Sequence, residues 1–343
     1  MPVITPAMDD PRWLEFVAHH PDATPFHTSA WSHVLEACYG YRPLLVAVAD
    51  ADGRLQAGLP LMAVQSRLTG RRIVALPFSD YCVPLASDDA GLRELLDGLQ
   101  VWWAEHQRPT IEIRWPLRPL ASVYPGEKMV RHVTPLDADA GQMLRRFKKS
   151  VVRLIHQAES AGLTIQQSDT WEAVQTYYRL HVETRRRLGA PTQPFRFFRL
   201  LWEHMLRPGQ GFVLLAYQGE TPIAGAVFLH ANKLLVYKYG ASLAEYWRLR
   251  PNNLLFWRAI QWGCENGYQT FDWGRTDYDD EGLRQFKQGW GSAESVLQYS
   301  ILSSQAPTSA KGRLQERYLP AVIQKSPAWV GRAIGEVLYG HFA

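Results

Sequence analysis

The sequence of 343 residues has few cysteines, no long apolar run and little net charge. Cys38, Cys82 and Cys264 lie far apart, with no CxxC or Cys/His spacing, which argues against a disulfide framework and a zinc site. No stretch of about 18 apolar residues is present, so we expect no transmembrane segment. Residues 1–10 lack the basic region and apolar run of a signal peptide. These absences predict a cytoplasmic protein with free thiols.

The charge balance is mildly basic and does not by itself imply a nucleic-acid partner. The 37 basic and 33 acidic residues give a net charge of +4, and 46% of the chain is hydrophobic, as in an ordinary globular protein. Its length predicts two domains. The histidines show no ligand spacing, so we expect no metal and no tightly bound cofactor.

Two halves of the chain share one order of predicted elements, helix–helix–three strands–helix–strand. In the first half these are residues 9–19, 28–39, 44–48, 56–64, 72–76, 89–106 and 110–115. In the second half they are residues 141–160, 171–188, 212–217, 223–230, 234–240, 253–266 and 269–273, with a last strand at 296–302. The repetition predicts a structural duplication of the α/β (α+β) class, in which each domain is a mixed, mostly antiparallel sheet flanked by helices.

The duplication sets the expected domain limits. We predict domains at residues 1–138 and 139–302. A linker and short helices follow at 303–343, and we expect them to pack back on the first domain. Contact of the last helix with a membrane surface is the alternative.

A strand followed by a helix start predicts a phosphate site in the second half. The strand 234–240 ends at Gly240, and Pro251-Asn252 opens an apolar helix. A helix start offers N–H groups and a positive dipole end. The candidate donor-phosphate residues are Arg250, Asn252, Asn253 and Leu254. Strand alternation places Leu235, Tyr237 and Tyr239 on one face. An ordinary capped helix explains the pattern equally well.

Two charged residues near aromatic side chains are candidates for chemistry. Lys287 is predicted to lie in a loop between Phe286 and Trp290, where it would stabilise an oxyanion or a leaving group. Asp272 would orient an amine or act as a base. The alternatives are a lysine that covers an aromatic patch and a carboxylate that binds loop amides.

Two basic runs complete the candidates. Residues 145–153 hold Arg145, Arg146, Lys148, Lys149 and Arg153, and the next helix ends in Arg185-Arg186-Arg187. Together they suit a phosphorylated or polyanionic partner, whereas a solvated helix face is the other interpretation.

Several blocks resemble the Fem family of aminoacyltransferases and the FemAB-like proteins of exopolysaccharide loci. The blocks are Tyr239-Gly240-Ala241-Ser242, Pro251-Asn252, Phe271-Asp272-Trp273-Gly274-Arg275, Phe286-Lys287-x-x-Trp290-Gly291 and Arg187-Leu188-Gly189-Ala190-Pro191. The resemblance covers roughly residues 26–302. It implies tandem GNAT-like (acetyltransferase-like) domains and transfer of an activated acyl group to an amine of a peptidoglycan or exopolysaccharide precursor.

The resemblance also assigns roles to residues. It places the family's lysine near the reacting ester at Lys287, and an arginine for the acceptor's phosphate at one of Arg185, Arg186 and Arg187. Together with the residue patterns above, this gives Lys287, Asp272 and Tyr239 as the candidate catalytic residues. The candidate substrate-binding residues are Tyr237, Arg185, Arg186, Arg187, Trp273, Arg275, Phe286 and Trp290. One position departs from the family pattern: where bridge-forming members carry a lysine after the first aromatic helix start, this chain has Leu35, which puts binding of a nucleotide-linked acceptor in doubt.

Three functions therefore compete. The first is a Fem-like transferase with aminoacyl-tRNA as donor and a cell-envelope precursor as acceptor. The second is an acyl-CoA-dependent N-acyltransferase acting on an amino sugar or small amine, although the Arg250–Asn253 turn has no glycine to cradle a pyrophosphate. The third is a duplicated module that binds glycan or peptide without catalysis.

Overall fold

The computed structural model describes residues 3–307 and 320–341, which form two compact units. The first unit holds Met1–Met129, Val296–Ser309 and Gly340–Ala343, and the second holds Val130–Ser295 and Ala310–Tyr339. The chain passes between the units inside two strands, β7 (Val123–Pro135) and β13 (Ala293–Leu302). The unit boundary at 129–130 therefore precedes the boundary at 138 that the sequence predicts, because a continuous strand gives no linker signal.

The first unit is built on an antiparallel sheet. Its strands are β1 (Val3–Ile4), β2 (Arg42–Ala49), β3 (Leu55–Ser66), β4 (Gly70–Val74), β5 (Leu85–Ala86) and β6 (Ile111–Ile113), and its helices are α1 (Pro11–His19), α2 (Ser29–Tyr39) and α3 (Asp89–Glu105). Neighbouring strands β1 to β4 are antiparallel, β5 pairs with β3, and β4 pairs with β6 in parallel.

Local sequence explains two of these features. At the β2–β3 turn the Asp50 carboxylate accepts from the N–H groups of Asp52 and Arg54 at 3.0 and 2.9 Å, as an Asp at a tight turn does. The Asp88 side chain caps α3 by accepting from Gly91 N–H at 2.7 Å.

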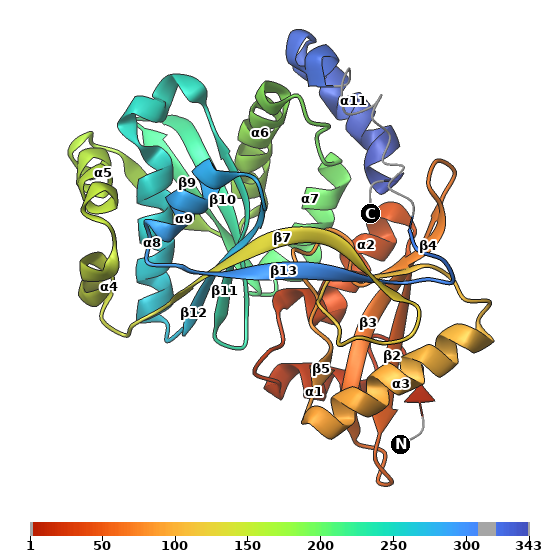
Figure 1. Ribbon diagram of the computed structural model, residues 1–343. Helices are drawn as coiled ribbons and strands as arrows, with labels where there is room; N and C mark the ends of the chain where they lie inside the picture. The colour runs from red at the N-terminus through yellow and green to blue at the C-terminus, as the bar shows by residue number, and fades with distance from the viewer. Residues whose placement is uncertain (1–2, 308–319, 342–343) are drawn as a thin grey trace. The chain divides into compact units, whose positions relative to one another are not determined.

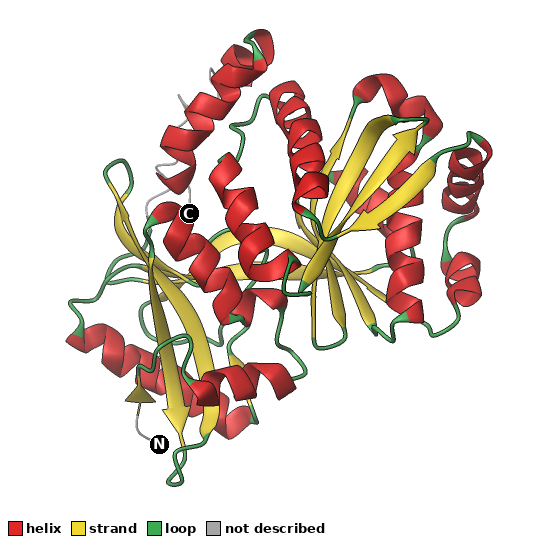
Figure 2. Ribbon diagram, turned by 180° about the vertical axis from the view of Figure 1, so that it is seen from behind, coloured by secondary structure: helices red, strands yellow, loops and turns green. Residues whose placement is uncertain are grey.

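The second unit repeats the plan with additional elements. Its strands run β8 (Thr164–Ser168), β9 (Gly211–Gln218), β10 (Thr221–Ala231), β11 (Leu234–Ser242) and β12 (Thr270–Asp277). Its helices are α4 (Ala140–Arg146), α5 (Lys149–Ser160), α6 (Trp171–Leu188), α7 (Phe195–Leu201), α8 (Pro251–Glu265), α9 (Glu281–Gln288) and α11 (Ala328–Leu338). Helix α8 covers one face of the sheet and α6 the other (Figures 1 and 2).

With the short strand β5 left aside, the order α6–α7–β9–β10–β11–α8–β12 matches α1–α2–β2–β3–β4–α3–β6, which confirms the predicted duplication and the fold class. The matching helix pair is α6 and α7, whereas the sequence predicted residues 141–160 and 171–188 as the pair and missed α7. The core between the second unit's sheet and α8 is aromatic, with Trp257, Phe271, Trp273 and Trp290 all buried. No helix in the described ranges is both long and apolar enough to cross a membrane.

Four predictions about this unit need correction. The single basic helix is two helices, α4 and α5, because the chain is extended at Phe147 and Lys148. Strand β8 was missed because it is mostly exposed and polar. The loop expected around Lys287 is helix α9, capped by Asp280. Helix α11 packs on α6 within the second unit, not on the first domain, although His341 just beyond it bonds Ser66 of the first unit.

Candidate functional site

The two parallel strands of the second unit pair over a short distance only. Leu234–Val236 of β11 pairs with Thr270–Asp272 of β12, and the pairing ends there. Beyond this point β11 stays paired with β10 through Ser242. The opening beyond Val236 exposes one edge of β11 next to the start of α8.

A bulge at Lys238 controls which side chains enter this opening. Val227 of β10 pairs with Tyr239 and its neighbour Phe228 pairs with Tyr237, so Lys238 is the extra residue. The bulge reverses the alternation, and the two tyrosines therefore lie on opposite faces. Tyr237 contacts Phe256 on the α8 side, and Tyr239 contacts Phe198 near α6. The prediction that both tyrosines share a face was wrong, because a bulge shifts the two-residue period by one.

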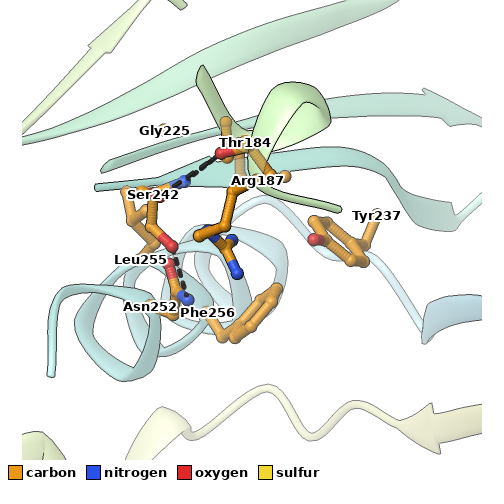
Figure 3. Close-up of a pocket in the computed structure, with 11 residues that line it drawn as sticks. Thr184, Arg187, Gly225, Tyr237, Ser242, Asn252, Leu255 and Phe256 are labelled. Carbon is orange, nitrogen blue, oxygen red and sulfur yellow. Dashed lines mark hydrogen bonds between the residues drawn. The ribbon is translucent and has the colours of Figure 1, made fainter. Parts of the chain in front are cut away.

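A pocket of about 180 Å³ lies at this opening (Figure 3). Its lining includes Thr184 and Arg187 from α6, Tyr237 and Ser242 from β11, and Asn252 and Phe256 from α8. Gly225 and Ala226 of β10 and Gly240 of β11 contribute backbone. The pocket is thus assembled entirely within the second unit.

Tyr237 supplies a neutral hydroxyl group to the pocket. Burial raises the pKa of this phenol to about 12, so it keeps its proton at neutral pH. The ring packs edge-on against Phe256, with ring centroids 4.8 Å apart. The hydroxyl oxygen lies where a side chain at Gly240 would start. Glycine at 240 is therefore required for this position of the hydroxyl.

Ser242 is held by three neighbours. Its hydroxyl oxygen accepts from Trp247 Nε1 at 2.9 Å and from Asn252 Nδ2 at 3.4 Å. Its backbone N–H donates to Thr184 Oγ1 at 3.0 Å, and its carbonyl accepts from the same hydroxyl at 3.3 Å. Two acceptor positions are thus used, which leaves the hydroxyl hydrogen of Ser242 as a donor at the pocket wall.

The first turn of α8 offers fewer phosphate ligands than its sequence suggests. Arg250 adopts a left-handed conformation (φ 60°), and Pro251 has no N–H. The N–H groups of Asn253 and Leu254 point to the Arg250 carbonyl at 3.1 and 3.4 Å. Of the four predicted donor-phosphate residues, only Asn252 lines the pocket; the side chains of Asn253 and Leu254 are buried.

The three arginines at the end of α6 point in different directions. Arg187 reaches into the pocket (Figure 3), and its guanidinium lies over the Trp247 ring, 4.4 Å from the ring centroid. Arg185 Nε donates to the Pro191 carbonyl, and Arg186 Nε donates to the Ser326 carbonyl, both at 2.9 Å. Among the described residues, the Arg187 guanidinium makes no hydrogen bond or ion pair, so its donors are available to an anion.

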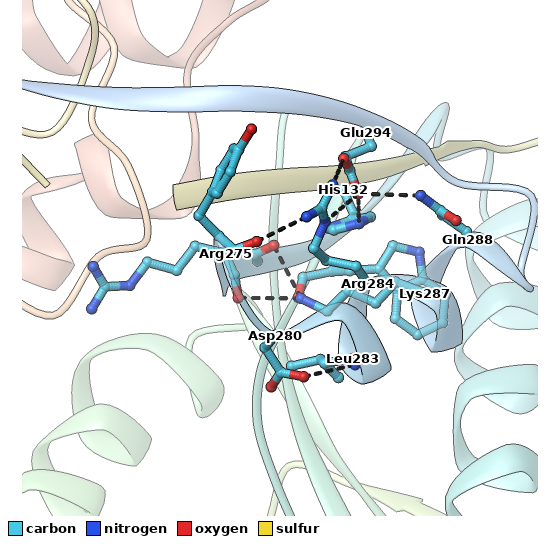
Figure 4. Close-up of polar contacts among 11 residues, drawn as sticks. His132, Arg275, Asp280, Leu283, Arg284, Lys287, Gln288 and Glu294 are labelled. Atoms are coloured by element: carbon cyan, nitrogen blue, oxygen red, sulfur yellow. Dashed lines mark hydrogen bonds and ion pairs between the residues drawn. The ribbon is translucent and has the colours of Figure 1, made fainter. Parts of the chain in front are cut away.

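Lys287 lies on α9 and is not part of the pocket lining. The residue is 3% exposed, and its ammonium donates to the carbonyls of Trp273, Gly274 and Arg275 at 2.8, 3.2 and 3.2 Å (Figure 4). Three acceptors match the three donors of an ammonium. The lysine thereby ties α9 to the middle of β12, just past the pairing of β12 with β11.

Asp272 binds the same part of β12. Its Oδ2 accepts from Arg131 Nε and Nη2 at 2.9 and 2.8 Å, and its Oδ1 accepts from Gly274 N–H at 2.8 Å. The carboxylate is fully buried, whereas Arg131 is 22% exposed. Asp272 therefore holds the backbone at Gly274, which has a φ of 69° inside the strand.

A polar network that the sequence did not reveal extends from α9. Glu294 accepts from Arg284 at 2.7 Å, from Gln288 at 3.2 Å and lies 3.1 Å from His132 Nε2 (Figure 4). Burial lowers the pKa of His132, and the hydrogen bond from Arg284 lowers the pKa of Glu294. No sequence signal could have found it, because its members come from separate segments.

The remaining predicted site residues lie outside the pocket. Trp273, Phe286 and Trp290 belong to the aromatic core, where Trp273 Nε1 donates to Thr134 Oγ1 at 2.9 Å. Arg275 is partly exposed on β12. Within the described ranges, no group of three His, Cys, Asp or Glu is placed to hold a metal ion.

Comparison with known proteins places this site in a family context. The model of the acetyltransferase (GNAT) domain matches residues 145–288. The lipid II:glycine glycyltransferase of Staphylococcus saprophyticus is 36% identical over 76 residues, which are 20% of this chain and 18% of that protein. The Staphylococcus aureus protein of the same name is 30% identical over 104 residues, 27% of this chain and 25% of that protein. The matches thus span less than a third of these relatives.

Solved structures share the fold over most of the chain. A crystal structure of FemX superposes with a TM-score of 0.70 at 18% identity, covering 88% of this chain and 97% of that one. A tandem GNAT protein from the clavulanic acid pathway gives 0.54 at 12% identity, covering 90% and 99%. The matched domain and the glycyltransferase relatives support a Fem-type family of GNAT proteins for this chain, as the motifs in its sequence predict, and the FemX structure shares its fold.

Proposed function

We propose that this protein is an acyltransferase that joins an activated acyl group to an amine of a cell-envelope precursor. The observation that carries the proposal is the pocket where β11 and β12 part, lined by the neutral Tyr237 hydroxyl and the Arg187 guanidinium. The glycyltransferase names of the relatives support the same reaction class. The lipid II in those names supports a lipid-linked acceptor, with an exopolysaccharide precursor as the alternative.

In the proposed reaction the acceptor nitrogen attacks the acyl carbonyl carbon and forms a tetrahedral intermediate. The carbonyl oxygen gains the charge, and collapse of the intermediate expels the donor's oxygen or sulfur with the electron pair of the broken bond. The amine loses one proton, and the leaving group gains one. Tyr237 would donate a hydrogen bond to the oxyanion or a proton to the leaving atom, since its O–H stays protonated.

Lys287 and Asp272 take positioning roles in this proposal. Both bind backbone groups of β12 just past its pairing with β11, where the two strands part and the opening begins. Tyr239 would support the wall on the α6 side through its contact with Phe198. Arg187 would bind phosphate or the acceptor's anionic group.

For the donor we favour aminoacyl-tRNA over acyl-CoA. The first turn of α8 presents Asn252 N–H as its remaining backbone donor in the described part of the chain, a weak cradle for a pyrophosphate. Exposed Lys148, Lys149 and Arg153 on and next to α5 would suit an RNA backbone. This choice places the reaction in the cytoplasm, where charged tRNA is found. The GNAT domain match keeps acyl-CoA as the second candidate.

A transfer assay tests the proposal. Purified protein would be given radiolabelled glycyl-tRNA or acetyl-CoA with a lysine-containing peptidoglycan precursor, and labelled amide product would be measured. We expect product, and we expect Arg187→Gln to raise KM for one substrate at least 10-fold. Arg186→Gln is the matched control, because Arg186 binds the Ser326 carbonyl outside the pocket. Binding of both substrates without product would favour the glycan- or peptide-binding module.

A further inference from the structure

Helix α11 buries two glycines and leaves two large apolar side chains exposed. Gly331 and Gly335 are buried, and a Cβ atom at Gly335 would overlap the carbonyl oxygen of Thr192. Thr192 N–H donates to the Gly331 carbonyl at 3.2 Å. The close approach needs glycine at 335, whereas a Cβ atom at 331 would make ordinary contacts. A surface helix of a globular protein normally buries its large apolar side chains; here Val330, Ile334 and Leu338 are half-buried, but Trp329 and Val337 stay exposed.

The outward face of α11 carries an apolar stripe. Trp329, Ala333 and Val337 follow one another at four-residue spacing and are exposed, Trp329 at 66% and Val337 at 69%. Val322, in the helical turn before α11, is 50% exposed. We call Val322, Trp329, Ala333 and Val337 the α11 stripe. It lies on the side of α11 away from the Gly331–Gly335 contact.

The charge around the stripe indicates what covers it. The described residues 320–341 hold two basic residues and one acidic residue, a balance of +1 (2 − 1). Lys325 and Arg332 flank the stripe and are exposed, and Arg332 lies over the Tyr178 ring, 5.8 Å from its centroid. The acidic residue on α11, Glu336, points toward α7, where its carboxylate accepts a hydrogen bond from Phe195 N–H at 3.3 Å.

We propose that the α11 stripe docks on the surface of a membrane that contains anionic lipid. Exposed apolar side chains flanked by lysine and arginine are the pattern of helices that lie in the interface plane. Tryptophan favours this interface because its ring is apolar and its N–H is polar. The role of this docking rests on the proposed function, because docking would bring the transfer pocket to a lipid-linked acceptor.

Vesicle co-sedimentation of the full chain tests the docking directly. Two vesicle compositions would be compared: phosphatidylcholine alone, and phosphatidylcholine with about 30% phosphatidylglycerol as the anionic lipid. We expect the wild-type protein to sediment with the anionic vesicles and to be released by high salt. The double variant Trp329→Ser/Val337→Ser should lose at least 10-fold in apparent affinity.

A matched control removes equally exposed apolar groups elsewhere. Leu68 and Val101 of the first unit are 58% and 57% exposed. Leu68→Ser/Val101→Ser should bind vesicles as the wild type does, and circular dichroism should show that both double variants fold. Equal loss in both variants, or a wild type that stays in the supernatant, overturns the proposal. A further outcome would overturn it: light scattering shows that the wild type is a dimer, the Trp329→Ser/Val337→Ser variant is a monomer, and neither binds vesicles. The stripe would then be the interface with a second copy of the chain.

The outcome is independent of the transfer chemistry. A protein that binds anionic vesicles but transfers no acyl group leaves the docking surface in place and refutes the proposed function. A protein that transfers to a water-soluble acceptor equally well with and without the stripe, and never binds vesicles, refutes the docking surface and leaves the proposed function in place.

Discussion

Tyr237 and Tyr239 are separated by Lys238, the bulge residue of β11, and lie in different environments. Tyr237 reaches the pocket, and Tyr239 packs among Phe197, Phe198 and His181 on the α6 side. Each could be replaced by phenylalanine with the loss of a single hydroxyl group. The pair therefore provides an internal control for the proposed role of the pocket hydroxyl.

We expect Tyr237→Phe to lower kcat/KM by about 10²-fold, the effect of removing one donor to a developing oxyanion. Tyr239→Phe should change it by less than about 3-fold. Because burial raises the pKa of Tyr237 to about 12, its proton is lost only at very alkaline pH. The wild-type pH–rate profile should then show no fall due to this group below about pH 10. Steady-state kinetics of both variants provide the measurement, and equal effects would refute the assignment.

The geometry of the opening depends on strand β12, just past the point where its pairing with β11 ends. Lys287 binds three of its carbonyls, and Asp272 holds Arg131 and the Gly274 N–H. In the sequence Asp272 and Lys287 looked like candidates for direct catalysis. Their contacts instead link β7, β12 and α9, so their replacement should first weaken the fold of this element.

We expect Asp272→Asn to reduce the free energy of unfolding by about 2–3 kcal/mol, because Arg131 then loses its charged partner at a buried site. The value is at the low end for a buried pair, since Arg131 is 22% exposed. Asp139→Asn is the control: its pair with Arg145 is 3.9 Å long and more than 60% exposed on both sides. Asparagine also caps helices, so that variant should stay within about 0.5 kcal/mol of the wild type. Urea denaturation would measure both, and equal stabilities of the two variants would contradict the role given to Asp272.

How far the sequence predicts these elements depends on where their signal lies. The duplicated order was visible because buried strands and amphipathic helices repeat with distinct periods. The bulge at Lys238 was not, because an extra residue in a strand leaves no mark in a tyrosine–lysine–tyrosine run. Arg187 could be named among the candidate arginines, but its difference from Arg185 and Arg186 depends on the Pro191 and Ser326 carbonyls that hold the other two.

At the scale of the whole molecule, charge is unevenly placed. Lys148, Lys149 and Arg153 are exposed and form no ion pair with any residue in the described ranges, whereas Arg145 and Arg146 pair with Asp139 and Asp137. The net charge of +4 is too small to hold RNA without a local cluster. A tRNA donor therefore requires that such a cluster contact its phosphates.

The triple variant Lys148→Gln/Lys149→Gln/Arg153→Gln should weaken tRNA binding and flatten its salt dependence. Each lost phosphate contact lowers the slope of log affinity against log salt by about 1. The control triple Arg42→Gln/Arg67→Gln/Arg71→Gln removes the same charge from exposed positions of the first unit, so both variants have a net charge of +1 (4 − 3). Filter binding across a salt series separates the two: loss confined to the first triple indicates local contacts on α5. Equal loss would mean that only net charge matters, and tRNA binding that neither triple changes would contradict a role of this helix in holding the donor.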